Sequence, residues 1–86
     1  MFTILIISFH SRHLIGNLVK SIDKTIPILI IENSQDQDLK NKLEKEHQNV
    51  RVIIPNENLG FAKAANLGIR EIKSEYIFLK RKCRIK

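Results

Sequence analysis

The sequence predicts an α/β fold of three layers, with a four-stranded parallel sheet built in the order β-α-β-α-β-α-β. Four short apolar runs rich in β-branched residues predict the strands. Three segments with helical spacing of apolar residues separate these runs. Because strands that alternate with helices form parallel sheets through right-handed crossovers, we expect one domain of this kind in the 86 residues.

The four strands are expected at residues 3–8, 28–31, 50–54 and 75–79. Each run is apolar over most of its length, as in strands that are buried on both faces. Pro27 precedes the second run and Pro55 ends the third, and proline interrupts both helices and sheet ladders. These boundaries leave three connections long enough for helices.

The first two helices begin at polar residues that are typical of helix N-termini. Ser11 is the expected N-cap of the first helix, whose apolar face consists of Leu14, Ile15, Leu18, Val19 and Ile22 and which ends near Lys24. Ser34 with Gln37 forms a capping-box pattern before the second helix, which we expect to end near residues 48–49. Two acid-first pairs, Asp36/Lys40 and Asp38/Lys42, are spaced to form ion pairs on that helix.

The third helix is predicted by a stretch that is rich in small residues. Its expected apolar face comprises Phe61, Ala65, Gly68, Ile69 and Ile72. Alanine and glycine allow a helix to lie close to a sheet, so these positions have a structural explanation. Phe61 is expected in the core.

The composition narrows the class of protein. Hydrophobic residues make up 43% of the chain and charged residues 28%, which is ordinary for a soluble globular protein. Five of the fifteen basic residues lie in residues 80–86, and the other ten nearly balance nine acidic residues. The net charge of +6 is therefore mainly a property of the tail, and nucleic acid is not the partner we expect.

The sequence lacks the patterns of several other kinds of site, of membrane-spanning segments and of signal peptides. A single cysteine excludes an internal disulfide and a cysteine-rich metal site. The chain has no P-loop, no dinucleotide-binding glycine motif and no zinc-ligand spacing. It has no apolar run long enough to cross a bilayer and no signal-peptide pattern, so we expect a cytoplasmic protein.

The candidate binding residues follow the first three strands. In an open parallel sheet, ligands bind outside the carboxyl ends of the strands, which here selects residues 8–10, 32–34 and 56–60 and the segment that follows Leu79. Each of the first three segments also has a structural interpretation, as a turn, a helix cap or, at Gly60, a backbone position with positive φ. Asn66 is unusual in the middle of a helix unless its amide has a specific partner.

Four stretches taken together resemble the N-terminal half of the family 2 glycosyltransferases, which have the GT-A fold and include rhamnosyltransferase-like members. They are "TILIISFHSRHLIGNLVKSI", "PILIIENS", "NENLGFAKAANLGI" and "EYIFL". The third stretch contains N-x-G-F-A-x-A-x-N-x-G-I and is the most specific. The resemblance covers residues 3–79 and implies a Rossmann-like nucleotide-binding half.

The resemblance implies a site for a nucleotide-diphosphate sugar linked to UDP or dTDP. Ser8 and Phe9 occupy the segment that lies against the nucleobase in the family. Glu32 stands where the family usually has an aspartate that binds the base or the ribose. The turn from Asn58 to Gly60 would direct the N-terminus of the third helix toward the nucleotide, where its free N–H groups favour anions.

The chain departs from the family after Leu79. The family continues with an acidic motif, Asn-Pro-Asp or Asp-x-Asp, whose aspartate holds Mg²⁺ or Mn²⁺ against the diphosphate. Here "KRKCRIK" follows and contains no carboxylate. We therefore expect residues 1–79 to be the nucleotide-sugar-binding half and residues 80–86 to be a basic tail that is not native to the family.

The functional hypothesis from the sequence is a glycosyltransferase-like protein without transferase activity alone, encoded by a gene that is truncated or frame-shifted near codon 80. No catalytic residue and no metal ligand is assigned in this chain. Two alternatives are a non-catalytic nucleotide-binding module and a nucleic-acid binder that uses the basic tail. A sheet with uncovered edges also predicts marginal stability or aggregation.

Overall fold

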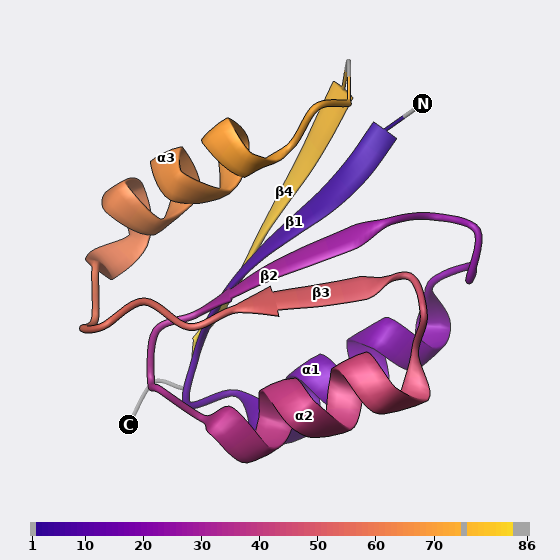
Figure 1. Cartoon of the computed structure of the whole chain (residues 1–86), viewed down its shortest axis with the longest axis horizontal. Coiled ribbons are helices and arrows are strands. Elements are labelled where there is room, and N and C mark those ends of the chain that lie inside the picture. Colours follow the sequence, from indigo (N-terminus) through magenta and orange to yellow (C-terminus); the bar gives the residue numbers. More distant parts are fainter. Residues whose placement is uncertain (1, 75, 84–86) are drawn as a thin grey trace.

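The structure is a computed structural model, and it describes residues 2–74 and 76–83. Its elements follow the predicted order (Figure 1). The strands are β1 (Phe2–Phe9), β2 (Ile28–Glu32), β3 (Val50–Ile53) and β4 (Tyr76–Cys83), and the helices are α1 (Arg12–Ser21), α2 (Gln37–Glu46) and α3 (Gly60–Glu71). All strand pairs are parallel, in the order β3-β2-β1-β4, which confirms the predicted fold class.

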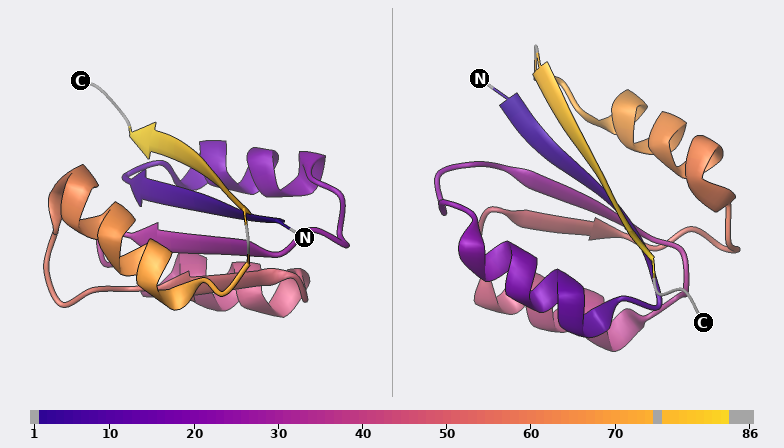
Figure 2. Two further views of the ribbon diagram at one scale, coloured as in Figure 1. Left: turned by 90° about the horizontal axis from the view of Figure 1, so that it is seen from above. Right: turned by 180° about the vertical axis from the view of Figure 1, so that it is seen from behind.

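The three layers arise because the helical connections run in two opposite directions along the sheet. From β1 the chain moves outward to β2 and β3, then returns across β2 and β1 to place β4 on the other side of β1. Helices α1 and α2 cover one face and α3 covers the other (Figure 2). The strand order therefore reverses between β1 and β4, the arrangement that places ligands at the carboxyl edge of such sheets.

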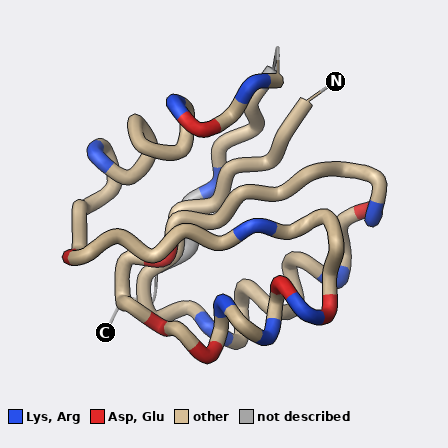
Figure 3. Tube along the Cα trace, in the orientation of Figure 1, with Lys and Arg blue, Asp and Glu red and all other residues tan. Residues whose placement is uncertain are grey.

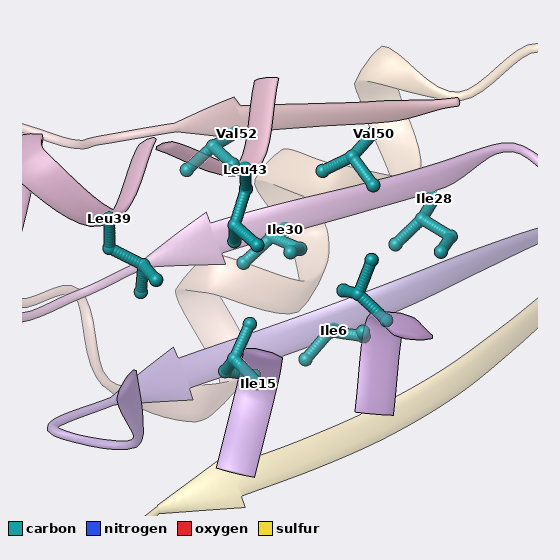
Figure 4. Close-up of a cluster of buried hydrophobic side chains, with 9 residues drawn as sticks. Ile6, Ile15, Ile28, Ile30, Leu39, Leu43, Val50 and Val52 are labelled. Atoms are coloured by element: carbon teal, nitrogen blue, oxygen red, sulfur yellow. The ribbon is translucent and has the colours of Figure 1, made fainter. Parts of the chain in front are cut away.

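Apolar side chains fill both interfaces between the sheet and the helices. Charged residues lie mainly on helices and loops (Figure 3). The larger core lies between the sheet and α1 and α2, where β-branched strand residues meet aliphatic helix residues (Figure 4). Each fully buried side chain of this size contributes about 1.5–3 kcal/mol. The members of this core are Ile6, Ile15, Val19, Ile28, Ile30, Leu39, Leu43, Val50 and Val52.

The second core lies under α3 and depends on small residues. Ala64, Ala65 and Gly68 are buried against the sheet, and a Cβ on Gly68 would lie 2.4 Å from Cδ1 of Leu5. The predicted apolar face of α3 is therefore wrong in part, because this close approach is made through the small side chains. Phe61 is 38% exposed instead of buried in the core, and Ile69 is 46% exposed.

Several predicted boundaries are corrected by the structure. Strand β4 continues to Cys83, because β1 extends to Phe9 and pairs in register with it throughout. Helix α2 ends at Glu46, before the predicted residues 48–49. The predicted start of the fourth strand at residue 75 lies outside the described residues.

Candidate functional site at the carboxyl edge of the sheet

The loops that follow β1, β2 and β3 meet at one edge of the sheet. The N–H of Asn33 donates to the carbonyl of Ser8 at 2.8 Å. The Asn33 side chain reaches the third loop, where its Nδ2 donates to the carbonyl of Gly60 at 3.3 Å and its Oδ1 accepts from the N–H of Leu59 at 3.2 Å. The structure therefore brings Ser8, Glu32 and Gly60 to the same edge, as parallel strands require.

Glu32 lies beneath this edge and organises the loop that leads into α2. Its side chain is 0% exposed. One carboxylate oxygen, Oε1, accepts from the hydroxyls of Ser34 at 2.7 Å and of Ser8 at 3.4 Å. The other, Oε2, accepts from the backbone N–H groups of Ser34 at 3.1 Å and of Asp36 at 2.8 Å. A buried charge needs such partners, and this one holds the turn in place.

The N-cap of α2 differs from the prediction. Asp36 caps the helix by accepting from the N–H of Leu39 at 3.1 Å, so the expected capping box of Ser34 and Gln37 is wrong. The reason is the buried carboxylate, because the Ser34 hydroxyl donates to Glu32 and accepts from the N–H of His10 at 3.2 Å. Gln35, with φ of 57°, turns the chain between Ser34 and Asp36.

Asp36 also binds Arg12 from the first loop. The guanidinium donates through Nη2 to Oδ1 at 2.5 Å and through Nε to Oδ2 at 2.9 Å. This bidentate contact holds the pKa of Asp36 below its usual range, although partial burial acts in the opposite direction. The predicted Asp36/Lys40 pair is therefore wrong, since Asp36 binds Arg12 and Lys40 binds Glu44 at 3.1 Å. The predicted Asp38/Lys42 pair is also not formed among the described residues.

A cavity of about 520 Å³ opens between the loops that follow β1 and β2. His10 takes the left-handed conformation, with φ of 51°, and its ring meets the edge of the Phe9 ring with 4.2 Å between centroids. The cavity thus combines imidazole, hydroxyl and charged groups at the end of β1. Its lining residues are His10, Ser11, Arg12, His13, Leu14, Ser34 and Asp36.

The turn before α3 has the geometry that the sequence suggested. Gly60 has φ of +72°, which side chains other than glycine rarely tolerate. Its N–H donates to Oδ1 of Asn58 at 2.9 Å, so the asparagine closes the turn that leads into the helix. Asn58 and Gly60 are exposed at this edge, whereas Ser8 is buried and Phe9 is half-buried.

Sequence reasoning missed the contacts that three residues make at this edge. Asn33 lies in a predicted candidate segment, but interpreting it as part of a helix cap does not predict that its side chain ties the second loop to the third. Arg12 and Asp36 are 24 residues apart, and their contact depends on the register between β1 and β2.

Comparison with known proteins gives the family. Residues 3–79 match the sequence profile of Glycosyl transferase family 2. The chain belongs to this family. A search of curated proteins gave no match.

The family's acidic metal motif has no counterpart in the described part of this glycosyltransferase-family chain. Within residues 2–74 and 76–83, no three His, Cys, Asp or Glu side chains are grouped so that they could hold a metal ion. The position after Leu79 is taken by Lys80, whose Nζ lies 5.4 Å from the centroid of the Phe78 ring. The described residues therefore do not fit a family-type Mg²⁺ or Mn²⁺ site.

The helices of this family member are short. Among the described residues, none is long and apolar enough to cross a membrane.

Proposed function

We propose that this glycosyltransferase-like chain binds a nucleotide-diphosphate sugar, linked to UDP or dTDP, at the carboxyl edge of its sheet. The observation that carries the proposal is the joining of three loops by Glu32 and Asn33 beside a cavity of about 520 Å³. Membership of the family makes a nucleotide-sugar donor the class of ligand to test first.

The chemistry of the edge suits a ligand with a base, a sugar and two phosphates. Helices α1 and α3 both begin here, and their first N–H groups and positive dipole ends favour an anion. In this proposal Ser8 and Phe9 lie near the nucleobase, Asn58 and Gly60 shape the turn that faces the phosphates, and Glu32 supports the loop between them.

We further propose that these 86 residues bind the sugar donor but do not transfer its sugar. Residues 80–86 supply no carboxylate to bind a cation near the diphosphate. Without a cation or another fixed group there, charge on the leaving diphosphate would lack the stabilisation that the family's metal provides. We therefore assign donor binding to residues 1–79 and no transfer step to the basic residues 80–86.

Titration of the chain with UDP, UDP-glucose and dTDP-glucose, with and without Mn²⁺, tests this function by calorimetry. We expect binding that does not require Mn²⁺, with no release or transfer of sugar. Asn58→Ala should weaken binding, because it removes the acceptor for the Gly60 N–H. The matched control, Asn49→Ala, alters a bond to the Ile26 carbonyl in another loop and should leave affinity unchanged.

Three results would contradict parts of the proposal. Absence of nucleotide binding would contradict the function itself. Sugar transfer that depends on Mn²⁺ would contradict the assignment of binding alone. Salt-sensitive binding to RNA that is lost in K80Q/R81Q/K82Q, without nucleotide binding, would instead favour the nucleic-acid alternative.

A further inference from the structure

Glu32 is the last residue of β2 and Asp36 caps α2, and their carboxylates differ in how many acceptor positions are already used. A carboxylate has about four lone-pair positions for hydrogen bonds. Glu32 accepts four bonds, from the hydroxyls of Ser8 and Ser34 and from the N–H groups of Ser34 and Asp36. A ligand that bound Glu32 would have to enter a fully buried site and displace one of these donors.

Asp36 has a free acceptor position and faces the cavity. Its Oδ1 accepts from the N–H of Leu39 and from Nη2 of Arg12, and its Oδ2 accepts only from Nε of Arg12 among the described residues. Its side chain is 23% exposed and lines the cavity between the first two loops. One lone pair of Oδ2 is therefore available for a donor from a ligand.

We propose that Asp36 accepts a hydrogen bond from a ribose hydroxyl of the bound nucleotide, and that Glu32 is a positioning residue that holds the turn on which Asp36 lies. This inference rests on the proposed nucleotide-binding function. Glu32 binds the backbone N–H of Asp36 directly, so its effect on the ligand passes through that residue. The carboxylate contact is thus four positions further along the chain than the residue that ends β2.

The test compares Asp36→Asn and Glu32→Gln in their binding of UDP, 2′-deoxy-UDP and 3′-deoxy-UDP. In Asp36→Asn we expect affinity for UDP to fall about tenfold or more, as for a lost hydrogen bond to a charged group. This variant should no longer distinguish UDP from one of the deoxy analogues. Its unfolding temperature should change little, because asparagine is also a good N-cap.

Glu32→Gln should show the opposite result: it should lower stability and leave the preference for UDP intact. Glutamine keeps one acceptor oxygen and loses the negative charge, so the charge-assisted bonds from the N–H groups of Ser34 and Asp36 are weakened whichever way its amide group turns. We expect a lower unfolding temperature and faster hydrogen exchange of these two amides, with the preference for UDP over the deoxy analogue retained in the folded protein. If this variant does not fold, Ser34→Ala removes one of the four bonds and should also retain the preference.

Two controls isolate the contact. Asp38→Asn removes a nearby exposed acid in the first turn of α2 and should leave both affinity and preference unchanged. Arg12→Gln removes the ion pair while leaving Asp36 in place, so the preference for UDP should remain.

The inference is overturned if Glu32→Gln abolishes the preference while Asp36→Asn retains it, since Glu32 would then contact the ribose. It is also overturned if both variants retain it. A chain that binds no UDP contradicts the proposed function and the Asp36 contact together. Hydrogen exchange in Glu32→Gln still decides the positioning part on its own, because slow exchange at Ser34 and Asp36 would contradict it.

Discussion

The two lateral edges of the sheet are protected in different ways. At the β3 edge, side chains of α2 bind the outward backbone groups of Val52. Its N–H donates to Oε2 of Glu44 at 2.9 Å, and its carbonyl accepts from Nζ of Lys40 at 2.6 Å. The two side chains also bind each other at 3.1 Å. An ion pair thus occupies positions that a further strand would need.

The β4 edge has no comparable cover among the described residues. Phe78 is 55% exposed and Leu79 is 41% exposed, and neighbouring strand residues point to opposite faces of the sheet. Lysine on an edge strand opposes unwanted pairing, and Lys80 is the described side chain that can do so here. An edge with apolar residues on both faces is the part of this molecule most prone to self-association.

Edge protection in this chain is local and depends on particular side chains. The β3 edge is closed by two charged residues on one helix, whereas at the β4 edge the described charge is that of Lys80 within the strand itself. The predicted tendency to aggregate can therefore be assigned to β4, which makes it testable by substitution at each edge.

The largest expected effect comes from opening the β3 edge with K40A/E44A. This double variant removes both partners of the Val52 backbone groups and should lower the free energy of unfolding by about 2 kcal/mol. Urea denaturation measures that loss, and sedimentation velocity should show larger oligomers. The control K42A/E46A removes an exposed lysine and an exposed glutamate with the same spacing. It should change neither the free energy of unfolding nor the size of the oligomers. Equal behaviour of the two variants would show that the edge is not protected by this ion pair.

A smaller loss of stability is expected when the pH is lowered. Burial alone would raise the pKa of Glu44, but the N–H of Val52 and the ammonium of Lys40 together outweigh it and hold this pKa below its usual range. A carboxyl group whose pKa is lowered in the folded state stabilises the protein above its unfolded pKa, which is about 4.3 for glutamate. That stability is lost as the pH falls through the folded pKa.

Chemical denaturation at a series of pH values from about 6 to 3 checks this, with the endpoints set on either side of the unfolded pKa. The free energy of unfolding of Glu44→Gln should fall less over this interval than that of the unaltered chain. Asp36 titrates with a lowered pKa in both proteins, so the difference reports Glu44. Parallel curves would contradict the contribution of Glu44 to the edge.

The smallest effect on stability is expected at the β4 edge. Phe78→Thr replaces an exposed aromatic residue and should change the free energy of unfolding by about 0.5 kcal/mol or less. It should nevertheless reduce self-association, measured by light scattering against protein concentration. Arg51→Thr, an exposed position on β3, is the matched control and should not reduce it. A sharp, reversible thermal transition of an unaltered monomer would contradict the predicted aggregation.

Most of the fold could be predicted because its signals are local. Runs of β-branched residues and helical periodicity gave the order of the elements, and that order implies the parallel sheet. The face of α3 could not be predicted from apolar spacing alone, because Ala64 and Gly68 bring the helix close to the sheet and leave Phe61 partly exposed. The end of β4 depended on pairing with Phe9, a contact between distant residues.

The candidate site was predictable in position and less so in detail. Parallel topology places the three loops at one edge whatever their sequence. The hydrogen bonds within them depend on which polar side chains reach one another after folding. Glu32 lies inside the turn, which moved the helix cap from Ser34 to Asp36. Neither the burial of Glu32 nor the contact between Arg12 and Asp36 has a signal in the local sequence.

The central claim is that the carboxyl edge binds the nucleotide, and a titration of the ¹⁵N-labelled chain with UDP tests it most directly. We predict saturable changes in the amide signals of residues 8–12, 33–36 and 58–60, with residues 22–27 and 47–49 at the opposite edge unchanged. Absence of changes, or changes confined to residues 80–83, would contradict the claim.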